Sequence, residues 1–185
     1  RYDSADGAEA DIRARVERKE IVIGFGHPVY TIGDPRNPII NLRSFGEDPA
    51  FVSKMAVAYV KGIQSTGAFA TAKHFPGHGD TGSDSHYSLP VILHGRARLD
   101  SLELYPFQAL IRYGIGSIMA AHLQIPALDD RPNRPSSLSK PIVYDLLRQE
   151  MGFTGLVFTD GLEMKGVTNH YGNGEVEAEA IAAGS

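Results

Sequence analysis

From residue 48 onward the chain alternates amphipathic stretches with short, unbroken runs of apolar residues. Between residues 52 and 63 the apolar positions follow helical spacing, and Asp48 and Pro49 stand where an N-cap and a first helical residue belong. Gly67 ends this stretch, and residues 69–72 have the composition of a buried strand. The pattern therefore predicts a helix followed directly by a strand.

The same order recurs along the rest of the chain. Asp100 and Glu103 have capping-box spacing at the start of a second helix, in which Pro106 predicts a kink. Ser139 is the expected N-cap of a third helix. The further predicted elements are helices at about residues 100–113, 139–151 and 175–183 and strands at residues 117–121 and 156–159. This alternation predicts an α/β fold of βα units, with a parallel sheet and helices on its faces.

Ionisable side chains follow the predicted strands. Lys73 and His74 come after the first strand, His122 after the second and Asp160 after the third. Because the carboxyl ends of parallel strands form one rim, where active sites lie in such folds, these groups are candidates for one functional site. The alternative is that each simply faces solvent, which is common for a single strand.

The composition argues against several classes of protein and site. The net charge of −4 gives no basic surface, so nucleic acid is not an expected partner, and the absence of cysteine excludes disulfides and thiolate metal sites. No apolar run approaches the roughly 20 residues of a membrane span. Residues 1–20 are charged throughout and do not form a signal peptide, which leaves the compartment open.

Residues 73–90 form the most informative segment. Pro76 and three glycines exclude a helix here, so His74 and His78 do not share a helical face despite their spacing of four. A zinc site built from these two histidines, His86 and an aspartate is an alternative that ranks below catalysis, because no rigid element sets ligand geometry. The glycines lack the Lys-Ser/Thr ending of a phosphate loop.

Asp84-Ser85-His86 is a candidate acid/base pair within this loop. A carboxylate two residues from a histidine can hold one ring nitrogen and leave the other for proton transfer. Elsewhere, Asp129 and Asp130 lie in a proline-rich loop and are expected to form a solvated turn, and Glu163 is expected to face solvent.

Two separated motifs carry a family resemblance. Lys-His-Phe-Pro-Gly-His-Gly-Asp-Thr at residues 73–81, followed by Asp-Ser-His, and Thr-Asp-Gly-Leu-Glu-Met at residues 159–164 resemble glycoside hydrolase family 3, and within it the β-N-acetylglucosaminidases. The likeness runs from about residue 37 to residue 185. The resemblance implies that residues 37–185 belong to a (β/α)8 barrel domain. A complete barrel needs roughly 250 residues, so this segment is expected to form only part of one.

The resemblance also implies roles for individual residues. Asp160 matches the nucleophile, His86 the acid/base and Asp84 the residue that orients it. The residues that match the family's sugar-binding side chains are Arg43, Lys73 and His74. No metal or cofactor is implied.

Residues 1–36 are expected to form a separate segment. Gly-Phe-Gly-His at residues 24–27 and Asp-Pro-Arg at residues 34–36 resemble citrate synthases, closest to 2-methylcitrate synthases, with His27 and Arg36 at functional positions. The change of resemblance within a few residues suggests a joined gene. Half a barrel leaves open sheet edges, so the chain alone is expected to be marginally stable, aggregation-prone or inactive.

The expected function is that of a retaining exo-β-N-acetylhexosaminidase. Its substrates would be N-acetylglucosaminides such as muropeptide or chitin fragments. Phosphorolysis is a related alternative, because a histidine acid/base does not repel phosphate as a carboxylate would. Two other classes stay open: acyl-CoA condensation with an oxoacid, from the citrate synthase resemblance, and carbohydrate binding without catalysis.

Overall fold

The computed structural model describes Gly7, Ala10, Ala14, residues 45–79, Thr81, residues 88–172 and residues 174–185. Gly7, Ala10 and Ala14 are helical. The helices and strands of the described part are α2 (Pro49–Gln64), β1 (Thr71–Phe75), α3 (Arg96–Arg98), the π-helical turn η2 (Leu99–Glu103), α4 (Leu104–Tyr113), β2 (Ser117–Ala120), the 3-10 turn η3 (Ser136–Leu138), the π-helix η4 (Pro141–Glu150), β3 (Leu156–Thr159), α5 (Lys165–Thr168) and α6 (Glu175–Ala183).

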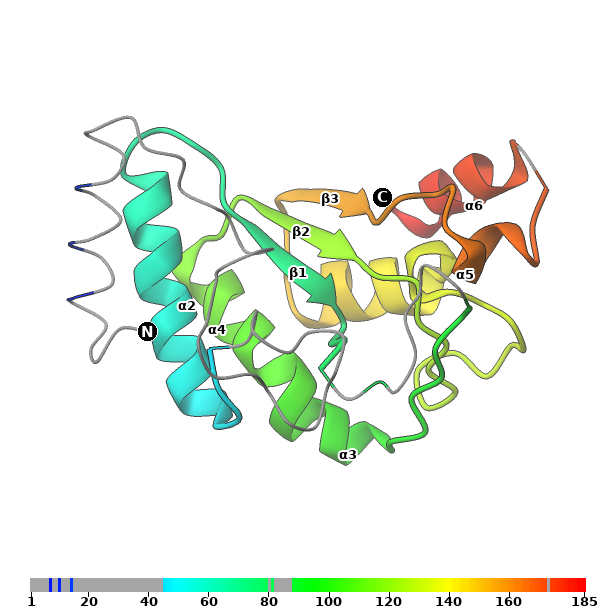
Figure 1. Ribbon diagram of the computed structural model, residues 1–185, viewed down its shortest axis with the longest axis horizontal. Helices are drawn as coiled ribbons and strands as arrows, with labels where there is room; N and C mark the ends of the chain where they lie inside the picture. Colours follow the sequence, from blue (N-terminus) through cyan, green and yellow to red (C-terminus); the bar gives the residue numbers. More distant parts are fainter. Residues whose placement is uncertain are drawn as a thin grey trace.

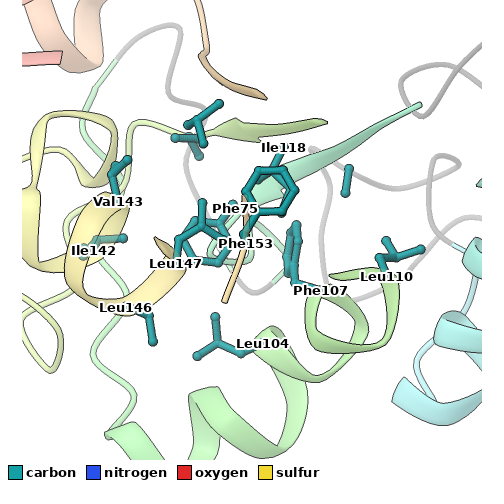
Figure 2. Close-up of a cluster of buried hydrophobic side chains, with 14 of the residues drawn as sticks. Phe75, Leu104, Phe107, Leu110, Ile118, Ile142, Val143, Leu146, Leu147 and Phe153 are labelled. Atoms are coloured by element: carbon teal, nitrogen blue, oxygen red, sulfur yellow. The ribbon is translucent and has the colours of Figure 1, made fainter. Parts of the chain in front are cut away.

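The three strands form one parallel sheet in the order β1-β2-β3. Figure 1 shows the strands side by side, with α4 and η4 lying along one face of the sheet. The core fills the space between them, where Phe75 and Phe107 pack edge to face at 5.2 Å between ring centroids. Figure 2 shows Phe75, Ile118, Leu147 and Phe153 in this cluster. The predicted α/β class, with parallel strands and outer helices, is confirmed.

Helix α2 begins as its sequence predicts. Asp48 is the N-cap, and its Oδ1 accepts a hydrogen bond from Phe51 N at 2.6 Å, with Pro49 as the first helical residue. At the other end, the Gln64 side chain donates to Gly114 O at 3.1 Å and accepts from Gly116 N at 2.8 Å. One amide group therefore joins the end of α2 to the turn that leads into β2.

The first strand lies later in the chain than predicted. It covers residues 71–75 instead of 69–72, and Phe69 is 74% exposed. Pairing with β2 sets this position, since Thr71 pairs with Ser117 and Ala121 N donates to Phe75 O at 2.8 Å. An apolar run carries no information about which residues the neighbouring strand selects. Lys73 and His74 therefore lie within the strand and not after it. The peptide bonds before His74 and Pro76 are cis.

The second helical stretch begins four residues before Asp100, so the predicted capping box is wrong. Gly95 precedes the first helical residue, Arg96, which donates to Asp100 Oδ1 at 2.7 Å from within the helix. The stretch continues through Pro106, and the π-helical turn η2 stands just before it. Proline lacks the N–H of the usual ladder and crowds the preceding turn, which a locally widened turn accommodates.

The remaining predicted elements match the structure within a residue or two, whereas η3 and α5 were not predicted. Strand β3 and helix α6 have the predicted bounds, and β2 ends one residue early. The backbone carbonyl of Ser139 accepts from Val143 N at 2.8 Å, and its hydroxyl from Ile142 N at 3.4 Å, as expected of a residue that starts a helix. No helix in the described residues is long and apolar enough to cross a membrane.

Candidate active site

The carboxyl ends of the three strands are joined by backbone hydrogen bonds and hold the candidate site. Asp160 directly follows β3, and its N–H donates to Ala120 O, the last residue of β2, at 2.9 Å. Ala121 N in turn donates to Phe75 O at the end of β1. The main chain of Asp160 thus continues the hydrogen-bond ladder of the sheet, and this bond holds the Cα of Asp160 in place at the end of β3.

His74 and Asp160 face each other across this rim. His74 Nε2 lies 3.8 Å from Asp160 Oδ2, and the two side chains are 13% and 24% exposed. The other carboxylate oxygen, Oδ1, accepts a hydrogen bond from Gly161 N at 3.0 Å. The carboxylate is therefore held by the backbone on one side, directed at an imidazole on the other, and still accessible from solvent.

The other predicted loop residues that the structure describes lie close by. Lys73 is half-buried in β1, one residue before His74. The ring of His78 packs edge-on against the ring of His74 at 5.6 Å, and its Nδ1 lies 2.7 Å from Thr81 Oγ1. His78 is buried, so the first turn after β1 is supported from inside the protein.

Gly77 brings this turn down onto the side chain of Glu103. Its φ is +141°, and a Cβ built there would lie 2.7 Å from Glu103 Cβ. Glu103 is itself buried in η2, where its Oε1 accepts from Arg98 Nη2 at 3.1 Å. The loop therefore needs glycine here both for its backbone angle and for the close approach.

His122 lies behind Asp160 with no solvent exposure. Its Nδ1 is 2.7 Å from Ser137 Oγ and its Nε2 is 2.9 Å from Gly161 O. Burial lowers the pKa of His122 from its ordinary value, against the opposing effects of the Gly161 carbonyl and the Asp160 and Glu163 carboxylates. The ring is accordingly neutral near pH 7.

Asp129 is not the solvated turn residue that the sequence suggests. It is 7% exposed, and its carboxylate accepts from Arg131 Nε at 2.8 Å and Ser139 Oγ at 2.5 Å. Burial alone would raise the pKa of Asp129, but the hydrogen bonds from Arg131 and Ser139 outweigh it and lower the pKa. Asp130 and Glu163 are exposed, as expected. Nothing in the spacing marks Asp129, because its partner Ser139 is ten residues away.

Of the predicted site residues, the structure brings His74 and Asp160 together, and Lys73 precedes His74 in β1. Arg43, Asp84 and His86 lie outside the described residues. Within the described part of the chain, no group of three or more His, Cys, Asp or Glu side chains is arranged to hold a metal ion. Ser137 and Gly161, which contact the ring of His122, are the supporting residues that the sequence does not reveal.

Comparison with known proteins gives consistent matches. A family profile described as "Glycosyl hydrolase family 3 N terminal domain" matches residues 3–185. Beta-hexosaminidase A of Pseudoalteromonas piscicida is 38% identical over 174 residues, which cover 89% of this chain and 29% of that protein. A solved family 3 β-N-acetylglucosaminidase from Paenibacillus sp. str. FPU-7 matches with a TM-score of 0.87 and 39% identity, over 98% of this chain and 35% of that one.

A second solved structure, a beta-glucoside phosphorylase BglX, matches with a TM-score of 0.83 and 28% identity, over 98% of this chain and 35% of its own. The chain spans less than half the length of each of these proteins.

The matches do not support a citrate synthase segment at residues 1–36. The family profile begins at residue 3, and the Paenibacillus structure covers 98% of the chain, so both run through this segment. The resemblance rested on a short apolar run with two glycines and on His27 and Arg36. Such a run is typical of strand–loop junctions in many α/β proteins, and a joined gene is not needed to account for it.

Proposed function

The chain belongs to glycosyl hydrolase family 3, and we propose that the protein that carries it is a retaining β-N-acetylhexosaminidase. The observation that carries the proposal is the placement of His74 Nε2 and Asp160 Oδ2, 3.8 Å apart, at the carboxyl ends of parallel strands. The motifs that hold these two residues are those that resemble the family's β-N-acetylglucosaminidases. Two similar proteins, a beta-hexosaminidase and a β-N-acetylglucosaminidase, support the same substrate class.

In the first step, the Asp160 carboxylate attacks the anomeric carbon of the terminal sugar while His86 donates a proton to the glycosidic oxygen. The carbon–oxygen bond breaks, the aglycone leaves as an alcohol, and the sugar is bound to Asp160 as an ester. Because Oδ1 already accepts from Gly161 N, Oδ2 is the oxygen proposed to attack.

In the second step, water attacks the same carbon and gives its proton to His86, and the bond to Asp160 breaks. Two inversions leave the configuration of the sugar unchanged. Asp84 is proposed to orient His86. The acid/base pair thus returns to its starting protonation state after each turnover.

Sugar recognition is proposed for Lys73, His74 and Arg43. His74 reaches Asp160 from β1, across the end of the central strand β2, so a sugar whose anomeric carbon lies over Asp160 would place a hydroxyl group against His74. The proposed substrates are N-acetylglucosaminides of the kind found in muropeptides or chitin fragments. No cofactor takes part in this chemistry.

Phosphorolysis is a second candidate, and the likeness to a beta-glucoside phosphorylase favours keeping it. In that reaction phosphate replaces water in the second step and the product is a sugar phosphate. The two reactions differ in one measurable way. Added phosphate accelerates release of the sugar from the ester in a phosphorylase and yields a sugar 1-phosphate, whereas a hydrolase gives the free sugar at the same rate.

The test uses the full-length protein that carries this chain and 4-nitrophenyl β-N-acetylglucosaminide. We expect release of N-acetylglucosamine with retained configuration, observed by NMR, and a covalent sugar on the peptide that contains Asp160 when a slow fluorinated substrate is used. Asp160→Asn should abolish both signals, while Asp145→Asn, an exposed carboxylate on η4, should leave them unchanged. An active Asp160→Asn enzyme excludes the mechanism.

A further inference from the structure

His122 is a fully buried titratable group that the proposed reaction does not use. It lies two residues beyond β2, and its ring bridges two segments that are far apart in the chain, at Ser137 and Gly161. Both ring nitrogens have hydrogen-bond partners, and leaving either one unpaired in the protein interior would cost about 1–3 kcal/mol. These two hydrogen bonds therefore hold the ring in one orientation.

The contacts determine which nitrogen carries the proton. The carbonyl oxygen of Gly161 can only accept, so the Nε2 that lies 2.9 Å away must donate. In the neutral ring Nδ1 is then an acceptor, and the hydroxyl of Ser137, at 2.7 Å, must be its donor. Burial favours this neutral form. Ser137 therefore selects the Nε2–H tautomer.

The donor Ser137 is itself held rigidly. Its backbone N–H donates to Ala121 O at 3.0 Å, and the neighbouring Ser136 hydroxyl donates to the same carbonyl at 2.6 Å. The Ser136 hydroxyl also accepts from Leu123 N at 3.2 Å. The loop that presents Ser137 is thus tied to the residues on both sides of His122.

At the other end of the ring, Gly161 links His122 to the carboxylate of Asp160. Gly161 O accepts from His122 and also from Met164 N at 3.1 Å, so its orientation is set by two donors. The N–H of the same glycine donates to Asp160 Oδ1 at 3.0 Å. Fixing the carbonyl of Gly161 limits rotation of this residue and keeps its N–H directed at the carboxylate.

We propose that His122, as the Nε2–H tautomer selected by Ser137, is a positioning residue for Asp160. It acts through the peptide groups of Gly161 and touches neither substrate nor reacting atoms. Its effect on turnover rests on the function proposed above; its hydrogen bonds do not. A displacement of a reacting group by about 1 Å can cost roughly 100-fold in rate, which sets the size of the expected effect.

The first experiment measures the arrangement without any reaction. Long-range ¹H–¹⁵N correlation spectra of the folded protein distinguish the two neutral tautomers of each histidine, and the His122 signals are assigned by their loss in His122→Gln. We expect the Nε2–H tautomer. We also expect the Gly161 amide to exchange with solvent much faster in His122→Leu than in the wild type.

The second experiment measures turnover in matched variants. Glutamine places its amide nitrogen close to the position of Nε2 and can still donate to Gly161 O, whereas leucine fills similar space and cannot. We expect His122→Leu to lower kcat by roughly 100-fold with KM within about threefold of the wild-type value. His122→Gln should recover most of that loss, and Ser137→Ala should fall between the two.

Ser117→Ala is the control. Ser117 is almost as buried as His122, belongs to β2, the strand that leads to His122, and donates to a carbonyl, Ala70 O, at 2.9 Å, but it lies at the far end of that strand. Its loss is expected to lower stability and leave kcat unchanged. If His122→Leu and Ser137→Ala lower kcat no more than Ser117→Ala does in equally folded protein, the proposal is overturned.

Failure of this inference can be told from failure of the proposed function. A wild-type protein that releases no sugar contradicts the proposed function alone. An Nδ1–H tautomer, or a Gly161 amide whose exchange is unchanged in His122→Leu, contradicts the positioning role whatever reaction the protein catalyses. An Nε2–H tautomer with accelerated exchange supports that role in either case.

Discussion

The main chain of Gly77 rests on the side chain of Glu103, with a separation that leaves no room for a Cβ. This contact joins the loop after β1 to the π-helical turn η2, in which Glu103 is buried. The loop carries His78, whose ring supports His74, and His74 faces Asp160. A substitution that displaces the backbone at Gly77 is therefore expected to shift His78 and, through it, His74 at the candidate site.

We expect Gly77→Ala to destabilise the protein by about 1–3 kcal/mol and to lower activity. Alanine is strained at a φ of +141°, and its methyl group would overlap Glu103. The matched control is Gly79→Ala in the same loop, because a Cβ there meets no atom within 4 Å. Urea unfolding of the two variants gives the comparison, and equal midpoints would contradict the contact.

Asp129 should make the stability of the protein depend on acid pH. Since the pKa of its carboxyl is lowered in the folded state, its contribution is present above the unfolded pKa of about 3.9 and is lost as the pH falls from there toward the folded pKa. Asp129→Asn should cost about 1–3 kcal/mol near neutrality. The difference in urea midpoint between wild type and variant should shrink as the pH falls below about 5.

The adjacent Asp130 provides the control for this prediction. It is exposed, so Asp130→Asn should change the midpoint little at any pH. A constant difference between wild type and Asp129→Asn from pH 7 to pH 3 would show that Asp129 does not carry the pH dependence.

Even the conservative replacement of Arg148 by lysine should destabilise the protein. Its Nη1 donates to Gly155 O at 2.5 Å and Phe153 O at 3.3 Å, its Nη2 donates to Gly184 O at 3.4 Å, and the guanidinium lies over the Phe153 ring at 5.4 Å. Lysine has one nitrogen and no planar group, so it cannot serve both sets of carbonyls or stack on the ring, and Arg148→Lys should lower the free energy of unfolding by about 1–2 kcal/mol. Thermal unfolding of the variants measures this effect. Arg112→Lys, at an exposed position of α4, is the control and should leave the unfolding temperature unchanged.

Within the proposed mechanism, His86→Ala should slow substrates according to their leaving groups. Sugar alcohols need a proton to leave, whereas 4-nitrophenol leaves readily as its anion. The variant should thus lose roughly 100-fold or more on a disaccharide and far less on the nitrophenyl glycoside. Asp160→Asn, by contrast, should lose activity on both. A uniform loss in His86→Ala would argue against its role as the acid.

The sequence predicts best those element ends that neighbouring residues encode. Helix α6 stops before Gly184 and η4 before Gly152, because both glycines adopt positive φ values that end a helix. Strand β1 differs from its prediction because pairing with β2, some 46 residues away in the chain, selects its residues. Local composition cannot register a contact over that distance.

In the candidate site, too, the features encoded by neighbouring residues are predictable and those set by distant residues are not. Asp160 is recognisable from its position after an apolar strand and from its motif. The support behind it is not, because Ser137 and Gly161 meet His122 from segments 15 and 39 residues away. Asp129 was expected in solvent for a similar reason, since its burial depends on Ser139 at the start of the next helix.

The Gln64 side chain, which bonds to both Gly114 and Gly116, has a practical consequence for labelling the protein. It anchors the last turn of α2 to the entry of β2. Residues 65–69 are exposed, and Ala68 already carries a side chain, whereas any side chain at Gly67 would be strained by its φ of +85°. A short epitope or a fluorophore-bearing cysteine introduced at Ala68 should therefore report on the protein from the end of the sheet opposite Asp160.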